Sequence, residues 1–402
     1  MGESETPCTI GSYPVDVVNG FCVRTKDPYL PTEAHEQKEF LCLGASIRVN
    51  ERQSSGTLGA IVEDVSNGTL YALSCDHVMN DVDEKKIIHP GLDVYSYYLR
   101  HHLTEYRGWI ERVTGPAVEL PHLPDDCLEE TELQKIFNDI KPIKDKYITS
   151  VSQYKLTMIQ FHEGKLEEAF DKRPRVIAKY LAGVRCNVQL ETNNGKEHFI
   201  DAAISELNKD EVQEVKAEGE IVIIGTKHYP SGECLSATAD VKDLFKSGSA
   251  TGFTQSNRLA DELGNRPTYI RGKSNGRWID VQCINCSKTV PAQSQARDLL
   301  SPCEQCNLDR WLKRCLYIQQ QGAKPFCEIG DSGAVVFEER GNEKSAAPGF
   351  AMIFAELPSQ YYKFAIASPL EIALEVLARK VSELRPNEKP CHLKLASKFD
   401  TI

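Results

Sequence analysis

A short turn near residue 330 constrains this 402-residue chain more than any other stretch. Its residues, Gly330-Asp331-Ser332-Gly333, lead into the apolar run 334–337, which is typical of a buried strand. A serine hydroxyl becomes a nucleophile only when a base removes its proton, and the resulting oxyanion needs backbone N–H donors. The flanking glycines allow the backbone to present such donors. The turn therefore predicts Ser332 as nucleophile and the N–H groups of Gly330 and Ser332 as oxyanion hole, unless it merely joins two strands.

A base for this serine is predicted upstream. Two apolar runs, 56–62 and 70–78, flank a turn in which Asn67-Gly68 is a hairpin signal. His77 follows the second strand, where an imidazole can face a serine from another sheet. A lone histidine at a strand end is more often a structural hydrogen-bonding group. Its position after the hairpin, combined with the later serine turn, favours the catalytic interpretation.

The third catalytic group is expected to be a carboxylate that holds the imidazole in one tautomer. Asp201 is the preferred candidate, because the apolar residues around it at 199–204 would bury it beside His77. Asp76 is adjacent to His77 in the chain, and neighbouring strand residues point to opposite faces. Asp81 and Asp240 lie in polar or less regular surroundings and are weaker candidates.

In the order His, Asp, Ser, these segments resemble the trypsin-like serine peptidases of the chymotrypsin fold. The chain is most similar to the intracellular branch related to the plant narrow-leaf protease and its bacterial relatives. The resemblance implies a triad of His77, Asp201 and Ser332. It lies in separated blocks, which are 56–59, 75–78, 89–91, 200–204, 246–252 and 330–333.

The resemblance also implies a mainly β fold with two antiparallel, six-stranded-type β-barrels. Two insertions interrupt them, and an amphipathic helix at 370–384 closes the second barrel. The assigned ranges are 1–40 for an N-terminal extension, 41–92 and 174–215 for the first barrel, 93–173 for a helical insertion, 216–257 and 316–385 for the second barrel, 258–315 for a zinc ribbon, and 386–402 for a polar tail.

The helical insertion is predicted from apolar residues at helical spacing among charged ones in 128–137 and 153–170. An antiparallel barrel does not need these two helices, so we interpret them as a packed insertion. The alternative roles are binding a regulatory partner, mediating self-association and covering the substrate site.

The zinc ribbon is predicted from the pattern Cys-x2-Cys, sixteen residues, Cys-x2-Cys. Two thiolate pairs at this spacing are typical of a tetrahedral structural zinc site. The surrounding basic residues are too few to favour nucleic-acid binding. The predicted zinc ligands are Cys283, Cys286, Cys303 and Cys306.

The net charge of −11 argues against generic affinity for nucleic acids or acidic membranes. The chain has no apolar run of roughly eighteen residues and no apolar signal segment at its N-terminus, so a cytoplasmic or nuclear protein is expected. Most of the fourteen cysteines are then expected to be small buried thiols rather than disulfide partners.

The resemblance places the specificity pocket at Phe326 and Cys327, before the nucleophile, and at Phe354, Ala355 and Glu356, on the strand after the serine strand. An apolar pocket base offers no partner to a buried cation. We therefore expect a small or medium uncharged residue on the acyl side of the cut, unless Glu356 turns inward and accepts a basic residue.

The predicted function is an intracellular serine endopeptidase that cleaves protein or peptide substrates through an acyl-enzyme. The alternative is a catalytically silent scaffold of the same fold, which binds protein partners through the helical insertion and the zinc ribbon.

Overall fold

The structure is a computed structural model of the chain. It describes residues 9–10, 13–14, 43–49, 55–80, 86–89, 91–116, 118–124, 129–148, 151–171, 174–191, 195–208, 238–239, 250–260, 267–274, 278–282, 311–320, 326–327, 330–339, 347–358 and 363–396.

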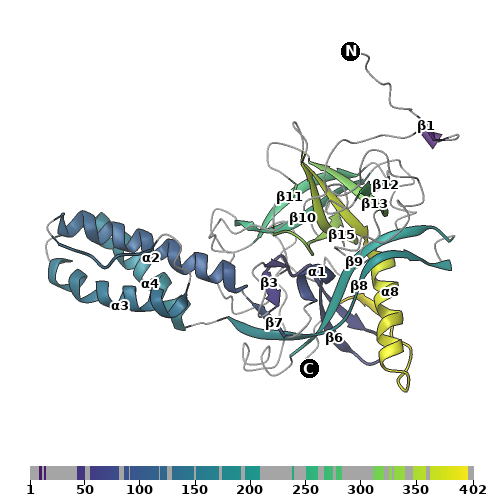
Figure 1. Cartoon of the computed structure of the whole chain (residues 1–402), viewed down its shortest axis with the longest axis horizontal. Helices are drawn as coiled ribbons and strands as arrows, with labels where there is room; N and C mark the ends of the chain where they lie inside the picture. The colour runs from purple at the N-terminus through teal and green to yellow at the C-terminus, as the bar shows by residue number, and fades with distance from the viewer. Residues whose placement is uncertain are drawn as a thin grey trace, which may run out of the picture.

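Strands dominate the fold and form two large antiparallel sheets, as the sequence predicts (Figure 1). The first sheet has eight strands in the order β17-β5-β6-β9-β8-β7-β3-β4. Its interior and the adjoining C-terminal helix α8 (Leu370–Leu384) share one large apolar core. The strands of this sheet are β3 (Ser46–Val49), β4 (Gly56–Thr57), β5 (Ala60–Asp64), β6 (Thr69–Ser74), β7 (Lys86–His89), β8 (Arg175–Gln189), β9 (Glu197–Leu207) and β17 (Leu393–Leu395).

The second sheet has seven strands in the order β11-β10-β14-β15-β16-β13-β12, and β11 pairs in addition with β13. It includes strands from the range assigned to the zinc ribbon. Most of 216–257 lies outside the described residues. The strands are β10 (Ala250–Ala260), β11 (Pro267–Ser274), β12 (Trp278–Gln282), β13 (Trp311–Gln320), β14 (Val335–Glu338), β15 (Gly349–Pro358) and β16 (Lys363–Pro369).

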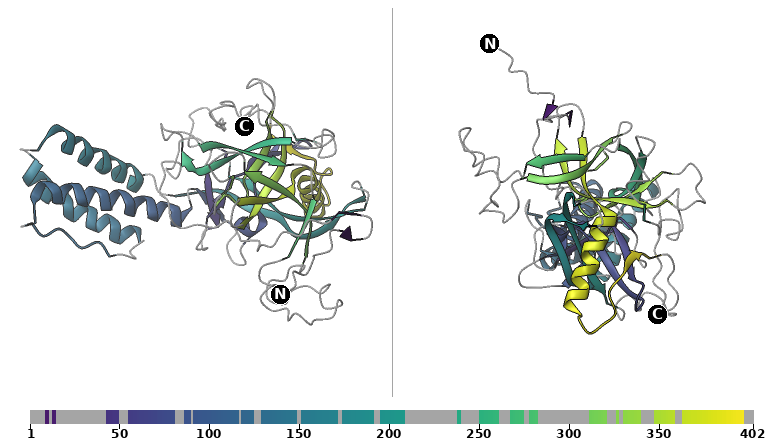
Figure 2. Two further views of the ribbon diagram at one scale, coloured as in Figure 1. Left: turned by 90° about the horizontal axis from the view of Figure 1, so that it is seen from above. Right: turned by 90° about the vertical axis from the view of Figure 1, so that its right-hand side faces the viewer.

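Three helices extend from the first sheet as a bundle, α2 (Leu92–Thr114), α3 (Glu130–Tyr147) and α4 (Gln153–Asp171) (Figures 1 and 2). The bundle has an apolar core of its own. Helices α3 and α4 overlap the predicted segments, whereas α2 was not predicted. Three tyrosines and a histidine are among the buried residues of α2, and they weaken its apolar pattern. The buried residues are Tyr95, Tyr98, Leu99, His102, Leu103, Tyr106 and Ile110.

The C-terminal helix α8 (Leu370–Leu384) has the predicted bounds and begins after Pro369, which is a favourable position for proline. Its apolar face packs into the core of the first sheet. The chain then returns as β17, which pairs with β5, so the segment predicted as a polar tail supplies an edge strand. A two-residue hairpin near the N-terminus, β1 (Thr9–Ile10) and β2 (Tyr13–Pro14), stands apart from both large sheets.

Candidate active site

The serine turn of the second sheet is attached to the glycine-rich segment of the first. The N–H of Thr57 donates to the carbonyl of Ser332, and its hydroxyl donates to the carbonyl of Gly330, each at 2.8 Å. The next residue, Gly333, has φ +98°, and a Cβ there would collide with the hydroxyl of Ser74. Glycine is therefore required at this position both for its backbone conformation and for space. These contacts fix Ser332 at the junction of the two sheets.

His77 reaches the same junction from the other side. It lies on α1 (Asp76–Met79), the short helix that begins where β6 ends. Its Nδ1 atom lies 2.8 Å from Oδ2 of Asp201, and its backbone N–H donates to Oδ1 of the same carboxylate at 3.1 Å. An acceptor at Nδ1 selects the tautomer with hydrogen on Nδ1 and the lone pair on Nε2. The residues predicted as base and carboxylate are therefore in contact.

Asp201 is charged in an otherwise apolar part of β9. The strand buries Phe199, Ile200, Ala202 and Ala203 around it, and only 2% of Asp201 is exposed. Burial alone would raise the pKa of this carboxyl, but the His77 imidazole, its hydrogen bonds and the Arg185 guanidinium outweigh burial and lower the pKa from its usual value. Asp201 is therefore an ionised acceptor in the folded protein.

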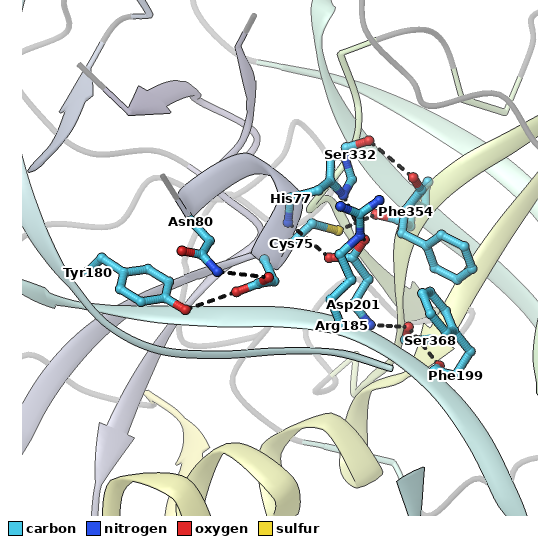
Figure 3. Close-up of polar contacts among 12 residues, drawn as sticks. Cys75, His77, Asn80, Tyr180, Arg185, Phe199, Asp201, Ser332, Phe354 and Ser368 are labelled. Atoms are coloured by element: carbon cyan, nitrogen blue, oxygen red, sulfur yellow. Dashed lines mark hydrogen bonds and ion pairs between the residues drawn. The ribbon is translucent and has the colours of Figure 1, made fainter. Parts of the chain in front are cut away.

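The hydroxyl of Ser332 lies beside His77 and donates to the carbonyl of Phe354 at 3.3 Å (Figure 3). That carbonyl is presented by an irregularity in β15, because the register with β16 shifts between Ile353 and Ala355. Such bulges re-aim backbone groups and are common next to active sites. In this structure the Ser332 hydroxyl is therefore directed to a backbone carbonyl of β15.

Three further hydrogen bonds tie this region of the first sheet to the second. The N–H of Asp201 donates to the hydroxyl of Ser368, which itself donates to the carbonyl of Phe199, both at 3.1 Å. The thiol of Cys75 donates to the carbonyl of Ile353 at 3.2 Å. Ser368 and Cys75 were not predicted as site residues, since nothing in their local sequence distinguishes them from other small buried residues.

Arg185 is a third contributor that sequence reasoning missed. Its Nε atom lies 3.4 Å from Oδ2 of Asp201. The signal that could have found it is a basic residue in the middle of the strand pattern 175–190, opposite the acidic residue of the next strand. The sequence of one strand does not show which residue of the next strand it faces. Only the register between β8 and β9 reveals that Arg185 lies opposite Asp201.

Of the other acidic candidates, the structure describes Asp76, whose side chain bonds to groups other than the imidazole. Asp76 accepts hydrogen bonds from Tyr180 at 3.0 Å and from Asn80 at 3.3 Å. Both of its oxygens are therefore engaged by these two side chains. The opposite-face argument was wrong in its premise, because Asp76 and His77 lie on helix α1 and not on a strand. Asp81 and Asp240 lie outside the described residues.

Cys75, His77 and Asp201 also have the donor atoms of a metal site, which lie within 4.8 Å of one another. Two features oppose a cation there. The guanidinium of Arg185 already faces the carboxylate oxygen that a metal would use. Burial and the charge of Asp201 raise the pKa of the Cys75 thiol well above its usual value, so the thiolate ligand is costly to form. A triad fits these residues better than a metal centre.

The predicted pocket residues are all buried, and the backbone carbonyl of one of them, Phe354, accepts from Ser332. Phe326 and Cys327 belong to the apolar core of the second sheet, and both are fully buried. Phe354 packs edge-on against Phe199, with ring centroids 5.1 Å apart, so its side chain faces the first sheet. Ala355 and Glu356 are also buried, and only 5% of the Glu356 surface is exposed.

The predicted zinc ligands Cys283, Cys286, Cys303 and Cys306 lie outside the described residues. The strands on either side of them are described, and Gln282 at the end of β12 pairs with Trp311 at the start of β13. Among the described cysteines, Cys75, Cys315, Cys327 and Cys391 are buried, as expected of small packed thiols, while Cys186 is exposed.

No protein-family model matches the sequence, and no curated protein matches it. Among the described residues, no helix combines the length and the apolar character needed to cross a membrane.

Proposed function

We propose that the chain is a serine endopeptidase with Ser332 as nucleophile, His77 as general base and Asp201 as the carboxylate that orients the base. One observation carries the proposal: an ionised, buried carboxylate holds both the backbone and the imidazole of His77, beside a serine in a glycine-flanked turn. Buried charges are costly, so this arrangement is retained only where a partner compensates for it. Here the compensating partner is the imidazole that the serine needs.

In the proposed reaction, the serine hydroxyl leaves the Phe354 carbonyl and rotates toward Nε2 of His77. The imidazole takes its proton as the oxygen attacks the scissile carbonyl, and Asp201 stabilises the imidazolium through Nδ1. The N–H groups of Gly330 and Ser332 are the proposed donors to the oxyanion. The imidazolium then returns its proton to the leaving amine, and a water molecule hydrolyses the acyl-enzyme by the same route.

We also infer that the two sheets are the two six-stranded barrels of the chymotrypsin fold. The second sheet supports this inference because β11 pairs with both β10 and β13, which gives six of its strands at least two neighbours each. In the first sheet β4 pairs with β3, and Gly59, just beyond β4, donates to Leu73 of β6. A catalytic group from each barrel then meets at their junction.

The remaining proposals follow from the same assignment. The substrate is a protein or peptide, the protein works in the cytoplasm or nucleus, and a structural zinc ion binds the four cysteines of 283–306. The α2–α4 bundle is the proposed surface for a regulatory partner or self-association.

The competing proposal is a silent scaffold. It is favoured by the direction of the Ser332 hydroxyl, which donates to the carbonyl of Phe354.

Comparison of peptides released by two proteins tests the proposal. A denatured proteome digest is incubated with wild type or with Ser332→Ala, and new peptide termini are identified by mass spectrometry. We expect a consistent set of cuts with wild type and a loss of up to ~10⁶-fold in rate with Ser332→Ala. Equal cleavage by both proteins would exclude Ser332 as the nucleophile, and absence of cleavage by wild type would favour the silent scaffold.

A further inference from the structure

A guanidinium lies against the carboxylate of the candidate triad. Arg185 on β8 pairs in register with Asp201 on β9, so both side chains project from the same face of the sheet. Its Nε atom is 3.4 Å from Oδ2, the oxygen that also lies 2.8 Å from Nδ1 of His77. The Arg185 side chain is 23% exposed, against 3% for Asp201. One carboxylate oxygen therefore interacts with an imidazole and a guanidinium at once (Figure 3).

The guanidinium of Arg185 acts on the pKa values of the other ionisable groups around this contact. Burial raises the pKa of the Asp76 carboxyl, and the charge of Asp201 raises it further. Burial and the Asp201 charge likewise raise the pKa of the Cys75 thiol. The charge of Arg185 acts in the opposite direction on Asp76, on Cys75 and on Asp201 itself. Arg185 thus offsets the negative charge of two buried carboxylates that lie near the base.

We propose that Arg185 is a positioning residue that extends the working range of His77 to lower pH, an inference that rests on the proposed hydrolase function. Oδ2 of Asp201 lies 2.8 Å from Nδ1 of His77, and a negative charge at that position favours a proton on the ring. A guanidinium that shares this oxygen weakens the stabilisation, because part of the carboxylate charge is already balanced. The imidazole then remains neutral, and able to accept the serine proton, at a lower pH than it would beside Asp201 alone.

Three variants separate charge from structure. Arg185→Gln removes the charge and keeps a hydrogen-bond donor, whereas Arg185→Lys keeps the charge. Lys179→Gln removes an exposed cation from the same strand, away from the site. In the pH profile of kcat/KM, we expect the acidic midpoint of Arg185→Gln to rise by about 0.5 to 1 pH unit. A partly exposed charge a few ångströms from a titrating group shifts its midpoint by about that amount. Arg185→Lys and Lys179→Gln should keep the wild-type midpoint.

A second readout does not require activity. In a Ser332→Ala background, NMR titration of the histidine side chains, assigned with His77→Gln, reports the protonation of His77 directly. We expect Arg185→Gln to raise the His77 midpoint by the same amount as in the kinetic profile. An unchanged or lower midpoint, or equal midpoints for Arg185→Lys and Arg185→Gln, would overturn the proposal. A raised NMR midpoint in a protein without hydrolase activity would support the coupling of Arg185 to His77 and refute the hydrolase assignment alone.

Discussion

At the scale of single residues, the site depends on where one negative charge is buried. Asp201 is surrounded by apolar neighbours and is compensated by His77 and Arg185. The contact with His77 was predictable, because a charge inside an apolar strand segment needs a partner. The contact with Arg185 was not, because it depends on the register between β8 and β9. The role of the Phe354 carbonyl was also hidden, since it follows from a bulge that the sequence does not announce.

The substrate pocket yields the first residue-scale prediction. Phe326 is fully buried at the predicted pocket base, so wild type should cleave after small or medium uncharged residues such as Ala, Val, Leu or Thr. Replacing Phe326 by Leu should shift the preference toward larger uncharged residues, because the side chain at the base is smaller. Profiling on a peptide library measures both preferences. Dominant cleavage after Arg or Lys, lost in Glu356→Gln, would show instead that Glu356 is the pocket's charge partner.

At the scale of elements, helices α2 and α4 are joined by two buried histidines. The Nδ1 atoms of His102 and His162 lie 3.0 Å apart, so one ring donates to the other. Burial, followed by the charges of His101, His162 and Lys165, lowers the pKa of His102 to about 3. Burial also lowers the pKa of His162, although Glu105 acts against that shift. Both rings are therefore neutral in the folded bundle at neutral pH.

A pH dependence follows from these lowered pKa values. As the pH falls below about 6.5, the unfolded chain binds a proton at His102 before the folded chain does, so folding stability decreases until about pH 3. The loss at pH 5 should be ~2 kcal/mol from His102 alone. Hydrogen exchange of α2 and α4 at pH 7 and pH 5 measures it. His102→Gln should reduce the acid-induced loss, and His122→Gln, at an exposed position that does not act on His102, should not. Equal losses in all three proteins would contradict this explanation.

The whole bundle is predicted to be separable from the sheets. His89 on β7 pairs with Arg175 on β8, so the chain leaves and re-enters the first sheet at neighbouring positions. The bundle core shares no residue with the cores of the two sheets. Replacing 91–173 by a short Asn-Gly turn should leave a folded protein whose Ser332 still reacts with a fluorophosphonate, at a rate within about tenfold of wild type. An unfolded product would show that the bundle stabilises the first sheet.

Some helices and strands could be predicted from the sequence, and others could not. The range of α8 was predicted because an uninterrupted apolar stripe lies between Pro369 and Pro386. The strands β8 and β9 were predicted from their β-branched and apolar runs. By contrast, α2 and β17 were missed. Tyrosines carry much of the buried face of α2, and β17 is only three residues long. Short edge strands gain their stability from the sheet they join, which no local pattern records.

At the scale of the whole molecule, the account predicts one structural zinc ion. Strand β12 ends at Gln282, and strand β13 begins at Trp311, its pairing partner. The four-cysteine segment lies between these two residues in the sequence. Elemental analysis of protein purified without chelator should give one zinc per chain, and Cys283→Ser should abolish it, because a tetrahedral site loses most of its affinity with one ligand. Cys186→Ser, at an exposed cysteine, is the matched control and should retain zinc. A metal-free wild type would refute the ribbon.

The central claim is that the junction of the two sheets activates Ser332. Wild type, Ser332→Ala and His77→Gln are incubated with a fluorophosphonate probe, and the modified peptide is identified by mass spectrometry. The account predicts one label per chain on Ser332, no label in Ser332→Ala and a rate reduced by several orders of magnitude in His77→Gln, because the serine needs the base to react. Labelling of wild type at another residue, or equal rates in wild type and His77→Gln, would contradict it.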